Sequence, residues 1–383
     1  MNPDLTKLLR DSVDSAERKR GTVNLLMAGM TGVGKSTLAN TVFSENLAAT
    51  GQGKPVTTGT NEYSKPGFPL TLLDTRGLET ARYRETLEQL RKLVIGRQAG
   101  DTERQVHAAW LCLSEDGRRV QDAEIELAAM LVRAGVPFLV VITKARADQG
   151  FAGVVADLLP GGAGVYRVRA LTEVLDDGHV LAPFGLRELI EATVELVPES
   201  SRNAFAAAQK VSLDLKVRRA RLIVNAAAAS AAATAAVPLP LSNLFTLAPV
   251  QLGMLAGINA TFGLSLSKTF LQTVISSALG IAGTGYATRA IASALLKFIP
   301  AIGTAAGGVI AATTASAMTI ALGRAYIQAI SVTLAQGEEV RAEALAEEFR
   351  QQFRARGREL GPGAGDQAEP PGGAGVSEDP KEP

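Results

Sequence analysis

The stretch "LLMAGMTGVGKSTLAN", Leu25 to Asn40, decides the fold of the N-terminal half of this chain. An apolar run passes directly into a glycine-rich loop, and a lysine, two hydroxyl residues and a helical pattern follow. The loop matches G-x-x-x-x-G-K-[ST] through Gly29, Gly34, Lys35 and Ser36. Glycines let successive backbone N–H groups turn toward one anion. The order of strand, glycine loop and helix therefore predicts a phosphate-binding loop.

The residues of this loop have distinct expected roles. The N-terminus of the next helix, which carries partial positive charge, is expected to point at the bound anion. We expect Lys35 to reach the β- and γ-phosphates and to act catalytically, and the Ser36 hydroxyl to bind Mg²⁺. The alternative is a glycine turn that contains Lys and Ser by chance, which the flanking strand and helix disfavour. The nucleotide-binding residues predicted here are Gly29, Thr31, Gly32, Val33, Gly34, Lys35, Ser36 and Thr37.

A second motif, "LTLLDTRGLET", places Asp74 at the end of a predicted strand and Gly77 three residues later. In this D-x-x-G arrangement the carboxylate can reach Mg²⁺ through water, and the Gly77 N–H can contact a γ-phosphate. The intervening segment "GKPVTTGTNEY" offers Thr57 or Thr58 as a further ligand, and we assign Thr58 a catalytic and metal-binding role. The predicted Mg²⁺ ligands are Ser36, Thr58 and Asp74.

Together these motifs resemble the TRAFAC-class GTPases of the Era-like and interferon-inducible (IRG-like) kind, over residues 22–198. The resemblance implies GTP and GDP as ligands, Mg²⁺ as cofactor and hydrolysis of GTP to GDP and phosphate. The base-reading motif of that class is [NT]-K-x-D, and the corresponding stretch here is "VVITKARAD". Thr143 and Lys144 match, but Arg146 occupies the Asp position, and the nearest carboxylate is Asp148, two residues later. This departure weakens the guanine assignment and leaves ATP as the alternative nucleotide.

The resemblance extends to a second base-contacting segment and to the rate of hydrolysis. Arg169 and Ala170 lie in "RAL", which resembles the last motif of the class. Leu78 follows Gly77 where related enzymes carry a glutamine that positions water, and the resemblance implies slow hydrolysis until a partner or second copy completes the site. Arg76 in the same loop is a candidate for action across a homodimer, although an exposed arginine of this kind is commonly only solvated.

Near-continuous apolar strands alternate with helical patterns over residues 21–198. This pattern predicts an α/β domain with a mostly parallel sheet covered by helices on both faces. The resemblance implies that this domain is a P-loop GTPase domain. An amphipathic N-terminal helix is expected within residues 1–20 and a connecting helix over 199–221. The single cysteine, Cys112, lies in an apolar strand and is expected to be a core residue.

The region 222–337 is rich in alanine and glycine, and we expect an all-α domain there. It contains four charged residues, all basic, and neither Asp nor Glu. One interpretation is membrane association through uncharged helices, since a span needs about 20 apolar residues. The alternative is a soluble alanine-packed bundle, which would lack a charged face toward water. The region also resembles a bacterial domain of unknown function described as having membrane helices. A charged helix over 338–360 and a disordered Gly- and Pro-rich tail over 361–383 complete the chain.

The net charge of +1 creates no field that would draw the protein to nucleic acid, which is not an expected partner. The expected partners are guanine nucleotide, membrane lipid and a second copy or regulatory protein. We expect the protein at the cytoplasmic face of the cell membrane. Two alternatives stay open: a soluble Era-like GTPase in ribosome or RNA assembly, and a nucleotide-gated membrane-interaction module with negligible turnover.

Overall fold

The computed structural model describes residues 5–44, 54–57, 60–75, 83–236, 243–264, 267–278, 308–336 and 340–359. The chain divides into two compact units, which are described separately. The larger unit comprises Lys7–Ile223 with Leu252–Leu271, and the smaller one comprises Met1–Thr6, Val224–Gln251 and Gln272–Pro383.

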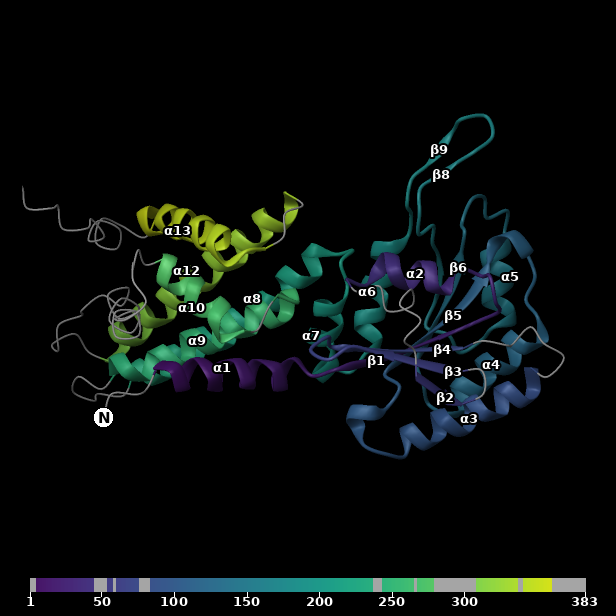
Figure 1. Cartoon of the computed structure of the whole chain (residues 1–383), viewed down its shortest axis with the longest axis horizontal. Coiled ribbons are helices and arrows are strands. Elements are labelled where there is room, and N and C mark those ends of the chain that lie inside the picture. Colours follow the sequence, from purple (N-terminus) through teal and green to yellow (C-terminus); the bar gives the residue numbers. More distant parts are fainter. Residues whose placement is uncertain are drawn as a thin grey trace, which may run out of the picture. The chain divides into compact units, whose positions relative to one another are not determined.

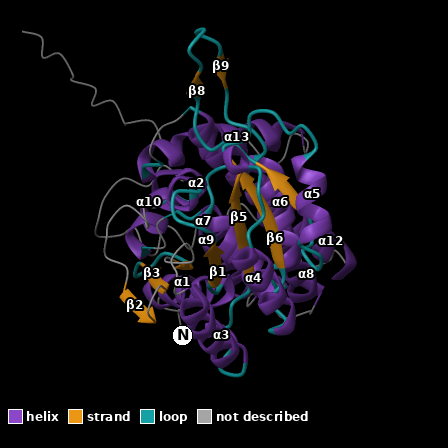
Figure 2. Ribbon diagram, turned by 90° about the vertical axis from the view of Figure 1, so that its right-hand side faces the viewer, coloured by secondary structure: helices purple, strands orange, loops and turns teal. Residues whose placement is uncertain are grey.

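The larger unit is built on a sheet whose described strands run in the order β2-β3-β4-β1-β5-β6-β7. Strand β1 pairs in parallel with β4 and β5, and the parallel arrangement continues through β6 to β7. Figure 2 shows β1, β5 and β6 side by side. The bounds are β1 Val23–Ala28, β2 Lys54–Thr57, β3 Thr60–Ser64, β4 Leu70–Thr75, β5 Ala108–Ser114, β6 Phe138–Thr143 and β7 Val165–Arg167.

The alternation of side chains along each strand explains why both faces of the sheet are covered. In β1, Leu25 and Met27 join one apolar cluster, and Leu26 and Ala28 join the other. Successive strand residues point to opposite faces, so an unbroken apolar strand requires a layer on each side. One layer contains α2 (Lys35–Val42), α6 (Leu186–Leu196) and α7 (Glu199–Ala208); the other contains α3 (Tyr83–Gln98), α4 (Asp122–Arg133) and α5 (Phe151–Leu158). The predicted α/β fold is confirmed.

Helix α7 contributes to the core of this unit. The Phe43 ring stacks on Trp110 with centroids 5.8 Å apart, and Phe205 of α7 meets Phe43 edge-on at 6.3 Å. The connecting helix expected over 199–221 is in fact two helices, α7 and α8 (Leu213–Ala236). Gln209 produces the break, because its side-chain amide accepts from the Ser212 N–H and donates to the Ser212 carbonyl.

Three antiparallel strand pairs were not predicted from the sequence. Strands β2 and β3 pair with each other, and β3 pairs antiparallel with β4. Strand β3 is largely polar and buries only Thr60 and Tyr63, so no apolar run marks it. A second hairpin, β8 (Glu173–Val174) with β9 (Val180–Leu181), has strands too short for alternation to be visible (Figure 1).

The N-terminal amphipathic helix is present as α1, Leu5–Arg20, and it buries Leu9, Val13 and Ala16. Its last turn carries Arg18, Lys19 and Arg20, where basic charge stabilises the negative end of a helix.

The described part of the smaller unit is helical, as the sequence predicts. Alanine packing joins Ala231 and Ala235 to Leu247 and Ala315. Tyr326 meets Phe349 edge-on at 5.2 Å, which joins the last two helices. The predicted tail, 361–383, lies outside the described residues. The helices here are the later part of α8, the early part of α9 (Asn243–Phe262), the later part of α10 (Lys268–Ala278), α12 (Gly308–Ala335) and α13 (Ala342–Glu359).

Within the described residues, one helical segment, Ala311–Ala335, is long and apolar enough to cross a membrane, and 56% of its apolar window is buried. Its hydroxyls bond along the helix: Thr319 donates to Ala315 O at 2.8 Å and Thr333 to Ala329 O at 3.0 Å. A core helix of a soluble bundle has the same properties, so this segment is compatible with both interpretations of the region. Within the region 222–337, residues 237–242, 265, 266, 279–307 and 337 lie outside the described residues.

Lys216, in α8, is buried within the larger unit. Its ammonium donates to Ala207 O at 3.1 Å and to Phe262 O at 2.8 Å, the carbonyls at the ends of α7 and α9. Burial lowers the pKa of Lys216 to about 7. Above that pH the folded protein holds one proton fewer than the unfolded chain, until the unfolded lysine also titrates.

The stability of the protein should therefore increase with pH above 7. Because the unfolded state binds the additional proton, we expect the free energy of unfolding to rise by about 1 kcal/mol per pH unit between pH 7 and 9. Lys216→Met should remove this rise, whereas Lys92→Met, at an exposed position, should retain it. Urea unfolding of the full chain at pH 7, 8 and 9 measures the slope. Equal slopes in the two variants would refute the assignment.

Candidate functional site

The glycine loop lies between β1 and α2, and the Lys35 side chain bonds across it to the backbone at its start. The Lys35 Nζ donates to Gly29 O at 2.7 Å and to Met30 O at 2.9 Å, and the side chain is buried. An ammonium group has three donors, so one remains for an anion held by the loop. This geometry places a positive charge directly beneath the predicted phosphate position.

Two glycines are required by the path of the loop. A Cβ on Gly29 would lie 2.2 Å from Cys112 O in β5, so the loop passes too close to the sheet for any side chain. Gly34 has φ +97° and caps the N-terminus of α2 in a left-handed conformation. Glycine adopts this conformation without steric cost. The two positions that the motif fixes as glycine thus have separate structural reasons.

The surface of the loop is open where phosphate is expected. Thr31, Gly32, Ser36 and Thr37 are exposed, whereas Val33 is buried beneath them. The first turn of α2 has no acidic residue, so its positive end is not neutralised from within the helix. Backbone N–H groups and the Ser36 hydroxyl are therefore available to an anion and its metal.

The residues predicted to hold Mg²⁺ are partly described. Asp74 is buried at the end of β4 and lies opposite Met27 of β1, two residues before Gly29. Mg²⁺ is bound in proteins by one or two carboxylates together with phosphate oxygens and waters. The Ser36 hydroxyl and Asp74 carboxylate fit that chemistry. Thr58, Arg76, Gly77 and Leu78 lie outside the described residues, and Thr57 ends β2.

Cys112 is a buried core residue, as expected. Burial raises the pKa of its thiol to about 12, Lys35 opposes this rise and Asp74 adds to it. A thiol with this pKa remains protonated at neutral pH and is not a nucleophile. In the described part of the chain, no group of three or more His, Cys, Asp or Glu residues is placed to hold a metal.

Thr143 joins the phosphate loop to the base-binding side of the site. Its hydroxyl lies within hydrogen-bonding distance of Val33 O in the loop, and 2.9 Å from Leu113 O in β5. The next residue, Lys144, has φ +54°, and its Nζ lies 3.5 Å from the Asp116 carboxylate. Lys144 is half exposed, so its aliphatic part is available to a planar ligand.

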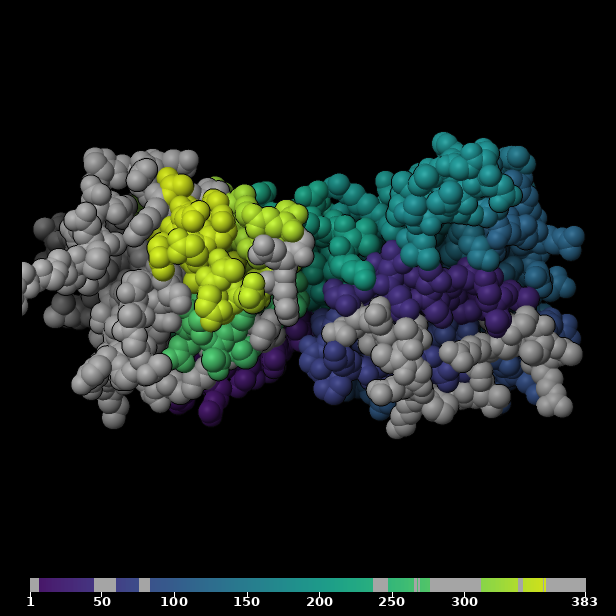
Figure 3. Space-filling view, turned by 45° about the horizontal axis from the view of Figure 1, so that its top comes forward, coloured from purple at the N-terminus to yellow at the C-terminus, as the bar shows by residue number. Residues whose placement is uncertain are grey.

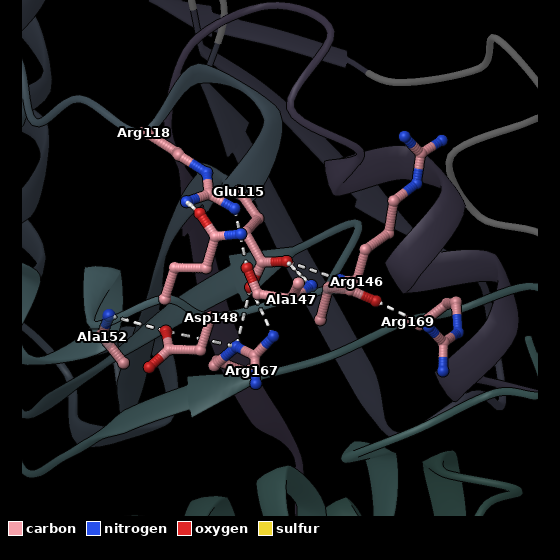
Figure 4. A network of polar contacts seen from close by, with 10 residues as sticks. Glu115, Arg118, Arg146, Ala147, Asp148, Ala152, Arg167 and Arg169 are labelled. Carbon is pink, nitrogen blue, oxygen red and sulfur yellow. Dashed lines mark hydrogen bonds and ion pairs between the residues drawn. The ribbon is translucent and has the colours of Figure 1, made fainter.

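Glu115 organises the loop that follows β6, and sequence reasoning did not single it out. Its buried carboxylate accepts from Arg146 N at 2.5 Å, from Ala147 N at 2.9 Å and from Arg167 Nε at 2.7 Å (Figure 4). We name the backbone segment 144–148 the base loop. The sequence feature that could have identified Glu115 is its position as an acidic residue directly after the apolar strand β5.

The predicted base-reading carboxylate, Asp148, has other partners. Its Oδ1 accepts from Ala152 N at 2.9 Å in the first turn of α5, and it lies 3.5 Å from Arg167 Nε (Figure 4). Asp148 therefore stabilises the start of a helix and neutralises an arginine. Both contacts are made by Oδ1 of the carboxylate that the sequence offered as a guanine acceptor.

Arg169 links the base loop to the β8–β9 hairpin. Its guanidinium donates to Ala145 O at 2.8 Å and to Ala182 O at 2.7 Å. Its backbone pairs with Phe184, and Ala170 packs against the core. The structure thus brings the predicted Thr143, Lys144 and Arg169 together around one loop, and Ala170, next to Arg169 in the chain, packs against the core.

Comparisons with known proteins agree with this geometry. Residues 24–144 match the family model described as 50S ribosome-binding GTPase. Over 97 residues the chain is 34% identical to "Ribosome biogenesis GTPase A" of Bacillus licheniformis. This match covers 24% of this chain and 34% of that protein. Over 93 residues it is 33% identical to "Magnetosome membrane protein 22" of Magnetospirillum gryphiswaldense, covering 24% and 47% respectively.

Among solved structures, a probable GTP-binding protein engB is matched with a TM-score of 0.32 and 16% identity, over 45% of this chain and 98% of that one. The chain spans about a third and about half of the length of the two curated relatives. Over residues 24–144, about a third of its length, the chain is similar to this GTPase family. The Era-like or IRG-like subclass is not distinguished by these matches.

The buried contacts of Glu115 generate a stability prediction. Glu115→Ala would leave Arg167 and two backbone N–H groups without their acceptor, and should cost about 3 kcal/mol in the free energy of unfolding. Asp116→Ala, at the adjacent exposed carboxylate, should cost less than about 1 kcal/mol. Urea denaturation of both variants measures the difference. Similar losses in the two would show that Glu115 does not organise the base loop.

Proposed function

We propose that this protein binds GTP and GDP with Mg²⁺ and hydrolyses GTP slowly to GDP and phosphate. The observation that carries the proposal is the glycine loop closed by the buried Lys35, within a segment that matches a GTPase family. A lysine with an unused donor and an open helix N-terminus suit a polyphosphate better than a neutral ligand.

The proposed roles follow from the chemistry of each side chain. Lys35 would neutralise charge on the β- and γ-phosphates as the bond to the leaving oxygen breaks. Ser36, Asp74 and Thr58 would hold Mg²⁺, which supplies further neutralisation of the phosphate oxygens. Gly77 would donate its N–H to the γ-phosphate. Lys144, Arg169 and Ala170 would surround the base.

Slow hydrolysis is proposed from the sequence of the loop after β4. Leu78 follows Gly77, and a leucine side chain cannot orient or polarise a water molecule. Turnover would then depend on a residue from elsewhere. A second copy of the chain or a regulatory partner would supply it, with Arg76 as a candidate acting across a homodimer.

We further propose that nucleotide state is coupled to membrane association of the C-terminal helices, at the cytoplasmic face of the cell membrane. Support comes from the absence of acidic residues over 222–337, from the apolar segment Ala311–Ala335 and from similarity to one relative, a magnetosome membrane protein. A membrane-interaction module with negligible turnover is the variant of this proposal in which the nucleotide acts only as a ligand.

A second candidate function is ribosome or RNA assembly, and it is favoured by the other relative, a ribosome biogenesis GTPase. RNA-binding surfaces are commonly basic and bear aromatic side chains. The region 222–337 has only four basic residues, so it offers little of such a surface. We therefore place membrane association first.

Phosphate release from GTP tests the proposed function. The full chain should release phosphate at less than about 1 per second, slow for an enzyme, and liposomes should raise the rate. Ser36→Ala should abolish release, because Mg²⁺ and the phosphates lose a ligand, whereas Ser64→Ala, at an exposed serine of β3, should not. Equal release by all three proteins would contradict the enzyme assignment. Stimulation by ribosomal RNA and not by liposomes would favour the second candidate.

A further inference from the structure

The side of the site that would face a nucleobase lacks a carboxylate at the aspartate position of the [NT]-K-x-D motif, since Arg146 stands two residues after Lys144. Guanine presents two donors on one edge, its N1–H and its 2-amino group, and selective binding requires an acceptor there. Which carboxylate accepts from the guanine edge is a question that rests on the proposed function, binding of a guanine nucleotide. Four carboxylates belong to the base loop or form hydrogen bonds or ion pairs with it: Glu115, Asp116, Asp148 and Glu173.

Two of these carboxylates are already used by the fold. Glu115 is buried and accepts from two backbone N–H groups and Arg167. Asp148 accepts from Ala152 N and lies beside the same arginine. Turning either toward a ligand would leave buried or helix-terminal donors without an acceptor, which costs about 1 to 3 kcal/mol per group.

Asp116 is available to solvent but is directed toward Lys144. Its Oδ2 lies 3.5 Å from the Lys144 Nζ and 3.4 Å from the Ser114 hydroxyl. The lysine stem is expected to pack across the plane of a base, so a carboxylate paired with its Nζ would lie beside that stem rather than at the donor edge. Asp116 is therefore the weaker candidate.

Glu173 has a different environment. Its two carboxylate oxygens accept from the Arg146 side chain, one from Nε at 3.0 Å and the other from Nη2, and neither accepts from a backbone N–H in the described contacts. Each oxygen of such a pair retains a further lone pair. The Arg146 guanidinium lowers the pKa of Glu173, so the group remains an acceptor at neutral pH.

The fold fixes Glu173 beside the base loop through Arg169. That guanidinium bonds to Ala145 O in the base loop and to Ala182 O at the end of the hairpin, and Glu173 pairs in register with Leu181. Arg146 contributes its backbone N–H to Glu115, while its side chain extends away from that carboxylate (Figure 4). In the space-filling view, the teal surface that includes the hairpin borders the purple surface that includes α2 (Figure 3).

We propose that Glu173, oriented by Arg146, is the residue that selects guanine by accepting from its N1–H and 2-amino group. The arginine that replaces the expected aspartate would then serve as the support for an acceptor supplied by the β8–β9 hairpin. The pair also avoids presenting an uncompensated guanidinium, a pure donor, to the donor edge of guanine.

Comparison of GDP with inosine 5′-diphosphate, which lacks the 2-amino group, tests this proposal. The full chain with Mg²⁺ should bind GDP at least about tenfold more tightly, the ratio expected for one hydrogen bond to a charged acceptor. Glu173→Ala should bring the ratio of the two dissociation constants close to one. Asp116→Asn is the control at a neighbouring exposed carboxylate, and it should keep the wild-type ratio.

The outcomes separate the inference from the proposed function. Failure of the wild-type chain to bind either nucleotide would overturn the proposed function. Binding of GDP with a tenfold preference in both wild type and Glu173→Ala would overturn the inference alone, as would a wild-type ratio near one. Loss of the preference in Asp116→Asn and not in Glu173→Ala would assign selection to Asp116. Thermal unfolding of each variant verifies that it is folded, and Glu173→Gln, which keeps the side-chain shape, should also reduce the preference.

Discussion

The rest of the site depends on the close approach of Gly29 to the backbone of β5. With Cys112 O only 2.2 Å from the position of a Gly29 Cβ, the loop can leave β1 here only without a side chain. Lys35 then spans the loop and bonds to the Gly29 and Met30 carbonyls. This arrangement holds one ammonium group and the start of α2 at a common point. The parallel sheet brings Asp74 to the same end of neighbouring strands, because the carboxyl ends of parallel strands share one edge.

The base side of the site is built by a different principle. The buried carboxylate of Glu115 stabilises the base loop by accepting hydrogen bonds from two backbone N–H groups of that loop. Arg167 and Arg169 connect this loop to β7 and to the β8–β9 hairpin. This network holds the loop through the Arg146 backbone N–H and leaves the Arg146 side chain to pair with Glu173. The residue that selects the base would then be Glu173 of the β8–β9 hairpin and not a residue of the base loop.

The sequence predicts the parallel part of the sheet and the position of the glycine loop between β1 and α2 well, because both depend on local patterns. Apolar strands buried on two faces have few polar residues, and a glycine loop needs fixed spacing. The polar strand β3 and the short hairpin β8–β9 have neither property, since tertiary pairing alone defines them. The contacts of Asp148 and Glu115 could not be predicted, because they depend on which residues the fold brings beside Arg167. Gln209, a single side chain that ends α7, likewise leaves no periodic signal.

The central claim is that the loop from Gly29 to Ser36 holds a nucleotide phosphate, and calorimetric titration of the full chain with GDP and Mg²⁺ tests it most directly. We predict saturable binding of one GDP per chain, and a loss of at least about 100-fold in Lys35→Ala, the effect of removing a buried charge that bonds to phosphate. Equal affinity in the variant, or no heat of binding in the wild-type protein, would contradict the account.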